Sequence, residues 1–157
     1  MTSSNETNHT APRLNYRAAA PAAVAGMYAL QQAVNQSGLE ASLQELVKLR
    51  ASQLNGCAFC IDMHFRDAKQ KGETDERLYL LNAWREAPGY TARERAALLW
   101  TETLTRLAEL GAPDDVFAEV RREFNDAELV NLTLAIVAIN GWNRFSVGFK
   151  VPPRAKL

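Results

Sequence analysis

From residue 45 to residue 64 the chain reads Glu45-Leu-Val-Lys-Leu-Arg-Ala-Ser-Gln-Leu-Asn-Gly-Cys57-Ala-Phe-Cys60-Ile-Asp-Met-His64. The residues before Asn55 have apolar side chains at helical spacing, and the Asn-Gly dipeptide at 55–56 is typical of a turn that ends a helix. A second helix is expected to begin at Cys57 and to run to about Lys71, where a glycine ends it. The stretch therefore predicts two helices joined by a tight corner, with both cysteines in the first turn of the second helix.

The chain on both sides of this stretch shows the same helical spacing. No segment shows the alternation of a strand between hairpin turns. The further helices are expected over 22–37, after Thr74, from a capping box at Thr91 and Glu94 to near Gly111, from Pro113, and after a cap at Asn125 or Asp126. The predicted fold is all-α, a single-domain helical bundle of six to eight helices.

The length of 157 residues fits one domain. Residues 1–12 are mostly polar and predict a flexible tail, residues 13–150 form the expected helical domain, and 151–157 are interpreted as an exposed C-terminal tail. Residues 129–139 are apolar nearly all round, which predicts a helix covered on most sides by the fold or by another subunit.

The composition excludes several classes of protein. Lys plus Arg equals Asp plus Glu at 18 each, so there is no basic excess for binding nucleic acid or a membrane surface. No apolar stretch reaches the length of a membrane span, and the Ala-rich run at 18–25 lacks the apolar core of a signal peptide. Two cysteines are too few for a disulfide-rich secreted scaffold. We expect a cytoplasmic protein.

Helix geometry groups the two cysteines with the histidine that follows them. At about 100° per residue, Cys57, Cys60 and His64 fall within an arc of about 60° on one face. Cys57 and Cys60 lie about 4.5 Å apart along the axis, within reach of a disulfide. His64 lies one turn beyond Cys60 but about 10.5 Å beyond Cys57. We therefore expect His64 to serve Cys60, directly or through one water, and not to reach Cys57.

The position of the cysteines favours thiolates. Unpaired N–H groups and the helix dipole favour an anion in the first turn, so the pKa of a thiol there can fall well below its free value of about 8.5. A thiolate attacks a hydroperoxide oxygen or a disulfide sulfur, whereas a thiol does not. Glu45, on the preceding helix, could orient His64 if its carboxylate is buried.

Each of these residues also has a plainer interpretation. Cys57 and Cys60 could be two buried structural cysteines, and His64 or Glu45 alone would be an ordinary polar residue. A structural zinc site has four protein ligands, whereas Cys57, Cys60 and His64 make three. The other histidine, His9, lies in the predicted tail, so the ligand count disfavours zinc. The thioredoxin interpretation of a CxxC pair expects a βαβ context that this chain lacks.

The order Glu45, Cys57, Cys60 and His64, with the spacing Glu-x11-Cys-x2-Cys-x3-His, resembles the alkyl hydroperoxidase D-like group of the carboxymuconolactone decarboxylase superfamily. The segments 49–56, 84–85, 91–98 and 140–144 look similar to that group as well. The resemblance covers roughly residues 14 to 149 and is most specific over 45–64.

The resemblance implies a peroxidase that forms a disulfide. Cys60 would attack the peroxide, Cys57 would resolve the sulfenic acid and exchange with an external dithiol, and His64 with Glu45 would form a proton relay. Phe59 stands where some relatives have a histidine, which makes the pocket more apolar. The family's dithiol reductant can be a lipoylated protein, and its subunits assemble into homo-trimers or homo-hexamers. No bound cofactor and no bound metal are expected.

Three other functions compete with a peroxidase. The same cysteine pair could serve a general dithiol–disulfide oxidoreductase by exchange alone. A lactone decarboxylase like the namesake of the superfamily has no need of a vicinal cysteine pair. A helical redox-sensing module could use the disulfide to change a partner contact. Consumption of hydroperoxide separates the peroxidase from the other three.

Overall fold

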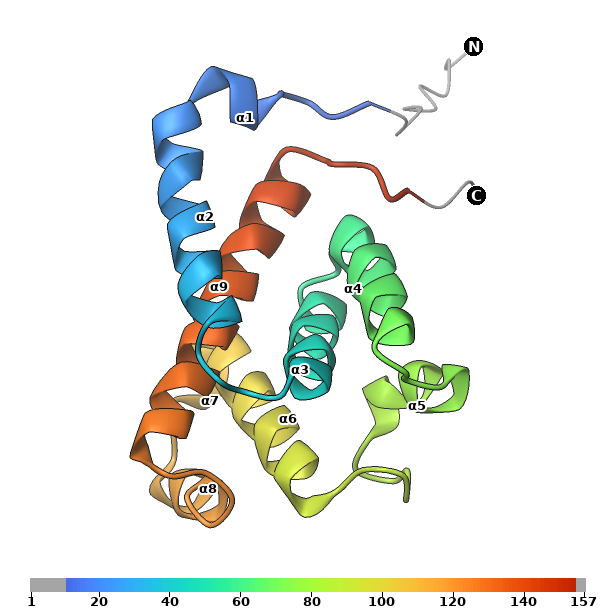
Figure 1. Ribbon diagram of the computed structural model, residues 1–157, viewed down its shortest axis with the longest axis vertical. Coiled ribbons are helices and arrows are strands. Elements are labelled where there is room, and N and C mark those ends of the chain that lie inside the picture. The colour runs from blue at the N-terminus through green and yellow to red at the C-terminus, as the bar shows by residue number, and fades with distance from the viewer. Residues whose placement is uncertain (1–10, 155–157) are drawn as a thin grey trace.

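The structure, a computed structural model, describes residues 11–154. Within this range it is all-helical, with no strand, as the sequence predicts. The helices in chain order (Figure 1) are α1 (Tyr16–Ala19), α2 (Pro21–Asn35), α3 (Ala41–Leu54), α4 (Ala58–Gln70), α5 (Asp75–Tyr79), the 3-10 helix η1 (Leu81–Ala83), α6 (Ala92–Thr105), α7 (Leu107–Leu110), α8 (Asp114–Val120) and α9 (Asp126–Gly148). Except for residues 11 and 12, the predicted N-terminal tail lies outside the described residues, as do residues 155–157 of the C-terminal one.

Side-chain caps fix where several helices begin. Thr91 and Asn125 each accept a hydrogen bond from the backbone N–H three residues on, and Glu94 and Glu128 accept one in return from the cap residue. These are the two halves of a capping box. Thr74 caps α5 in the simpler one-way manner. The residues at which these helices begin are therefore determined by the local sequence.

The described part of the chain holds nine α-helices, more than the six to eight that the sequence predicts. The additional ones include α1 and α7, which have four residues each and are too short to show a period. The expected helix from Thr91 to Gly111 is wrong at its C-terminal end, because α6 ends at Thr105. The hydroxyls of Thr101 and Thr103 donate to carbonyls one turn earlier, a bond that bends helices.

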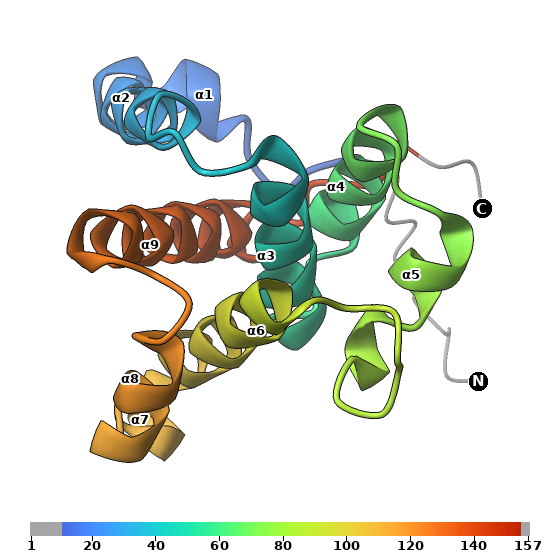
Figure 2. The same ribbon diagram turned by 60° about the horizontal axis from the view of Figure 1, so that its bottom comes forward.

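Helix α3 lies at the centre of the fold and packs against α4, α6 and α9 (Figure 2). One side of it, with Leu43 and Val47, joins a buried cluster formed with α6, α8 and α9. The opposite side, with Leu46 and Leu49, joins a second cluster formed with α4, α5, η1 and the turn after it. Because α3 is enclosed on both sides, a polar residue on it is held in a low-dielectric setting.

A polar network fixes the corner between α3 and α4 against α9. The Asn55 side chain donates to the side-chain oxygens of Asn140 (3.0 Å) and Asn143 (2.8 Å). Asn143 in turn donates to the hydroxyl of Ser52 at 3.0 Å. The Asn55 turn that precedes the cysteines is therefore anchored from the C-terminal helix, 85 to 88 residues further along the chain.

A buried carboxylate ties α6 to α3 and to the segment after α5. Glu102 accepts hydrogen bonds from Arg50 and from the Trp84 indole, each at 2.8 Å, and from Arg85. This bonding satisfies a carboxylate that is only 8% exposed. None of the helices within residues 11–154 is long and apolar enough to span a membrane.

Candidate active site

The two cysteines lie at the corner between α3 and α4. Gly56 has a φ of 64°, in the left-handed region that a glycine adopts without a steric penalty, and turns the chain after α3. Cys57 is then the N-cap residue of α4, and its sulfur accepts a hydrogen bond from the Cys60 backbone N–H at 3.3 Å. The sulfur of Cys57 thus occupies the place that the side-chain oxygen of Ser, Thr or Asp takes at other helix starts.

Cys57 and Cys60 are joined in a disulfide, with their Cα atoms 5.3 Å apart. The spacing along the helix predicts such a bond. Each cysteine is only 1% exposed. Cys57 is the N-cap residue, with extended dihedrals (φ −87°, ψ 92°), so it precedes the regular helix α4 that carries Cys60 and His64.

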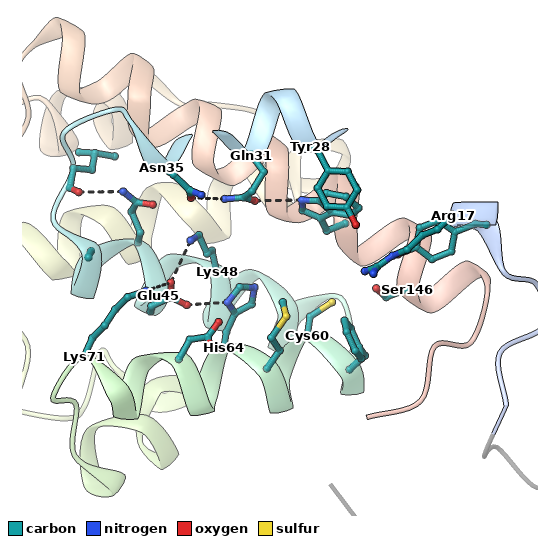
Figure 3. Close-up of a pocket in the computed structure, with 18 residues that line it drawn as sticks. Arg17, Tyr28, Gln31, Asn35, Glu45, Lys48, Cys60, His64, Lys71 and Ser146 are labelled. Carbon is teal, nitrogen blue, oxygen red and sulfur yellow. Dashed lines mark hydrogen bonds and ion pairs between the residues drawn. The ribbon is translucent and has the colours of Figure 1, made fainter. Parts of the chain in front are cut away.

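His64 and Glu45 meet between α4 and α3. The His64 Nδ1 atom lies 2.8 Å from a carboxylate oxygen of Glu45, and both residues are buried, at 6% and 2% exposed. Figure 3 shows His64 and Cys60 projecting from α4 to the same side, with Glu45 of α3 beside the imidazole on the side away from Cys60. The structure therefore places the carboxylate against the imidazole, and His64 and Cys60 line the same cavity.

Two lysines hold the other oxygen of Glu45. The ammonium of Lys71 lies 2.6 Å from it and that of Lys48 lies 3.2 Å from it. Burial by itself raises the pKa of Glu45, but the hydrogen bond from His64, the charge of Lys48 and the hydrogen bond from Lys71 outweigh burial and lower the pKa to about 2. Glu45 is therefore an anion at neutral pH, and its oxygens only accept hydrogen bonds.

A cavity of about 510 Å³ opens in front of His64 and Cys60. Aromatic side chains from four helices, α1, α2, α4 and α9, form part of its wall, and Arg17 lies at the end away from Glu45 (Figure 3). Phe59 also lines the cavity, at the position where the resemblance predicts a more apolar pocket. Cys57 does not line it, so the two sulfurs of the disulfide differ in what can approach them.

Three potential metal donors meet in the same cavity. Ligand atoms of Glu45, His64 and Asp67 lie within 4.8 Å of one another. However, the two ammonium groups of Lys48 and Lys71 already neutralise the Glu45 carboxylate. A divalent cation would have to displace or repel them, so the charge at this cluster suits a proton relay better than a metal site.

Lys48, Asp67 and Lys71 also belong to this site, and the sequence does not predict them there. Lys48 follows Glu45 at i+3, and Asp67 and Lys71 follow His64 at i+3 and i+7, so helical spacing places each of them near Glu45 or His64. Charged residues at such spacing are common on exposed helix faces. The pattern alone does not separate an exposed charged face from charged residues that line a site.

Comparison with known proteins places the chain among related sequences and folds. The family model for the carboxymuconolactone decarboxylase family matches residues 21–103. The uncharacterized protein YdfG of Bacillus subtilis is 41% identical over 135 residues, which cover 86% of this chain and 92% of YdfG.

Two solved structures have the same fold. A protein of unknown function from Agrobacterium tumefaciens, proposed to be the antioxidant defence protein AhpD, matches with a TM-score of 0.90 and 46% identity, over 93% of this chain and all of that one. The debrominase Bmp8 matches with a TM-score of 0.79 and 15% identity, over 88% of this chain and 74% of that one. The likeness to Bmp8 is one of fold alone.

Proposed function

The chain belongs to the carboxymuconolactone decarboxylase family and is AhpD-like, and from this premise we propose that it is a thiol-dependent peroxidase that reduces hydroperoxides in antioxidant defence. One observation supports this function most. Cys60 and His64 line the same cavity, and Glu45 holds the imidazole from behind at 2.8 Å.

The relay works through the two nitrogens of the imidazole. Because Glu45 is ionised and only accepts, the Nδ1 atom of His64 must donate to it. The Nε2 atom is then left to exchange a proton with the Cys60 thiol, directly or through one water. The buried carboxylate stabilises the imidazolium that forms when Cys60 becomes a thiolate.

The oxidation half of the cycle has two steps. The Cys60 thiolate attacks the terminal oxygen of the hydroperoxide, the O–O bond breaks, and the alkoxide leaves as an alcohol with the proton from His64. Cys57, as a thiolate, then attacks the sulfur of the sulfenic acid, and hydroxide leaves as water after protonation. Two thiols and one hydroperoxide thus give one disulfide, one alcohol and one water.

The reduction half requires a dithiol from outside the protein. We propose a dithiol reductant that can be a lipoylated protein and no bound cofactor, because the electrons pass by thiol–disulfide exchange. Such a cycle runs only where dithiols are kept reduced, so we propose that the protein acts in the cytoplasm.

We also propose that the protein works as a homo-trimer or homo-hexamer. Val130 and Val137 of α9 are 67% and 53% exposed and line an apolar groove with Trp100 and Phe117. Adjacent exposed apolar side chains of this kind mark interaction surfaces. A helix that is apolar on nearly all sides is usually covered on most of them, and a second copy of the chain would cover the side of α9 that lines this groove.

A general dithiol–disulfide oxidoreductase is the alternative function. The observation that favours it is that the disulfide lies next to a second cavity, which a thiol could use in the absence of peroxide. A redox-sensing module would use the same chemistry without turnover. Both alternatives predict reduction of the disulfide by dithiols but no consumption of hydroperoxide.

Steady-state turnover tests the proposal against these alternatives. Cumene hydroperoxide and hydrogen peroxide are supplied with excess dihydrolipoamide, and consumption is followed for the wild type, Cys60→Ser and Cys57→Ser. We expect turnover in the wild type only. A wild-type protein whose disulfide is reduced by dihydrolipoamide, but which consumes neither peroxide, would contradict the peroxidase and support the alternative.

A further inference from the structure

The Cys57 side of the disulfide faces a separate cavity of about 450 Å³ between the start of α4 and the end of the described chain. We call it the C-terminal groove, and it is lined by Gly56, Cys57, Ala58, Phe59, Ser146, Val147, Lys150, Val151, Pro152 and Pro153. Phe59 and Ser146 also line the Cys60 cavity, so they mark where the two cavities adjoin. The sequence analysis expects an exposed tail at 151–157, whereas Val151, Pro152 and Pro153 are half-buried here.

From this geometry we propose that the C-terminal groove is the binding site of an aliphatic dithiol reductant, in which Lys150 holds the attacking sulfur as a thiolate against Cys57. The proposal rests on the proposed function and deepens it, because it separates the site of the reductant from the site of the peroxide. It also gives a role to a residue outside the relay.

The groove has the chemistry that such a ligand needs. Its walls are mostly apolar, which suits an aliphatic stem, and its one cationic side chain is Lys150. Within residues 11–154 no carboxylate pairs with this ammonium, so it is available to an anion. An ammonium near a thiol favours the thiolate, which is the form that attacks a disulfide.

The backbone at Lys150 supports a role for its side chain. Lys150 follows α9 with a φ of 50°, and it is the one residue other than glycine with a positive φ in the described chain. Its N–H bonds to the Val147 carbonyl, and the N–H of Val151 bonds to that of Ser146 at 2.9 Å, which closes the helix end. Glycine is strongly preferred at this position, because a residue with a side chain is strained at a positive φ. A lysine here therefore carries a conformational cost and places a side chain in the groove.

The reduction proceeds in two exchanges that need no other reductant. One thiolate of the dithiol attacks the Cys57 sulfur, the disulfide bond breaks, and its electron pair stays on Cys60 as a thiolate beside the His64 relay. The second thiol of the same dithiol, as a thiolate, then attacks the first sulfur of the dithiol, which is bonded to Cys57 in the mixed disulfide. The bond to Cys57 breaks, and Cys57 leaves as a thiolate. Two electrons and two protons pass to the protein, and the dithiol leaves as a cyclic disulfide.

The test measures reduction of the oxidised full-length protein without any peroxide. The protein is oxidised with diamide, and the rate constants of reduction by dihydrolipoamide and by tris(hydroxypropyl)phosphine are taken from the gain of two mass units. The phosphine is neutral and forms no thiolate, so the ratio of the two rate constants isolates the effect of Lys150. The variants are Lys150→Gln, Lys150→Gly and Lys150→Arg, with Lys69→Gln as a control on an exposed lysine.

We expect the ratio to fall about three- to tenfold in Lys150→Gln and Lys150→Gly, to stay within about twofold in Lys150→Arg, and to be unchanged in Lys69→Gln. Lys150→Gly suits the backbone at this position, so a loss there is not a folding defect. Equal ratios in the wild type, Lys150→Gln and Lys150→Gly would overturn the proposal. Because no peroxide is present, this outcome is independent of whether the protein turns over hydroperoxides.

Discussion

Glu45 shows at the scale of a single residue how a buried charge is kept. Its carboxylate is 2% exposed, yet three groups donate to it: His64 to one oxygen, and Lys48 and Lys71 to the other. A buried carboxylate without such partners would become neutral. The partners keep the charge that the proposed His64 relay requires.

The lowered pKa of Glu45 predicts a pH-dependent contribution to stability. A pKa of about 2 in the folded state, against about 4.5 unfolded, stabilises the fold above pH 4.5 by on the order of 3 kcal/mol, and this contribution is lost as the pH falls from about 4.5 to about 2. Urea unfolding should show Glu45→Gln to be less stable than the wild type by about that amount at pH 7. The difference should shrink to less than half at pH 3.

The control for this series is Glu109→Gln, which removes an exposed carboxylate paired with Arg106. It should change the free energy of unfolding by well under 1 kcal/mol at either pH. A constant difference between the wild type and Glu45→Gln from pH 7 to pH 3 would show that the pKa of Glu45 is not lowered in the folded protein, and that His64, Lys48 and Lys71 do not stabilise its charge.

At the scale of elements, the corner between α3 and α4 depends on side chains of α9. Asn143 is 1% exposed, accepts from Asn55 and donates to Ser52. These bonds fix the turn after which Cys57 caps α4. The geometry of the disulfide is thus set from a helix that is distant in sequence.

Asn143→Ala should therefore weaken both stability and chemistry. It takes one partner from the half-buried Asn55 amide and one from the buried Ser52 hydroxyl, which costs about 1–3 kcal/mol in the free energy of unfolding by urea. It should also slow oxidation of the cysteines by hydroperoxide, since the corner loses its anchor. Asn131→Ala is the matched control, because Asn131 lies on the same helix and donates to the Ser37 carbonyl. A normal oxidation rate in Asn143→Ala would show that α9 does not position the corner.

The sequence predicts the elements of the site better than the contacts between them. The Cys57–Cys60 disulfide and the placing of Cys60 with His64 follow from spacing within one helix. The approach of Glu45 to His64 across α3 and α4 is predicted only on the condition that the carboxylate is buried, and the family resemblance implies it as well. The approach of Lys71 to Glu45 is not predicted. Such contacts depend on how two helices pack, which a helical period does not specify. Lys150 was missed because a left-handed backbone at a lysine has no signal in the sequence.

At the scale of the whole molecule, the apolar groove along α9, lined by Val130 and Val137, is exposed to solvent in the single chain. If a second copy covers it, Val137→Asp places a charge in the interface and should shift the protein to smaller species in sedimentation velocity. Tyr79→Asp, on an exposed aromatic residue of α5, should leave the assembly unchanged. An assembly that Val137→Asp leaves intact, or a wild type that sediments as a monomer, would show that α9 is not the subunit interface.

The whole molecule also separates the two halves of the proposed cycle, with the peroxide at the Cys60 cavity and the reductant at Cys57. The most direct measurement is the intact mass of the reduced protein after rapid mixing with one equivalent of hydroperoxide, for the wild type and Cys60→Ser. We predict a rapid loss of two mass units in the wild type and no fast oxidation in Cys60→Ser, because the relay serves Cys60. A wild type whose thiols stay free would contradict the peroxidase, and fast oxidation of Cys60→Ser would place the nucleophile at Cys57.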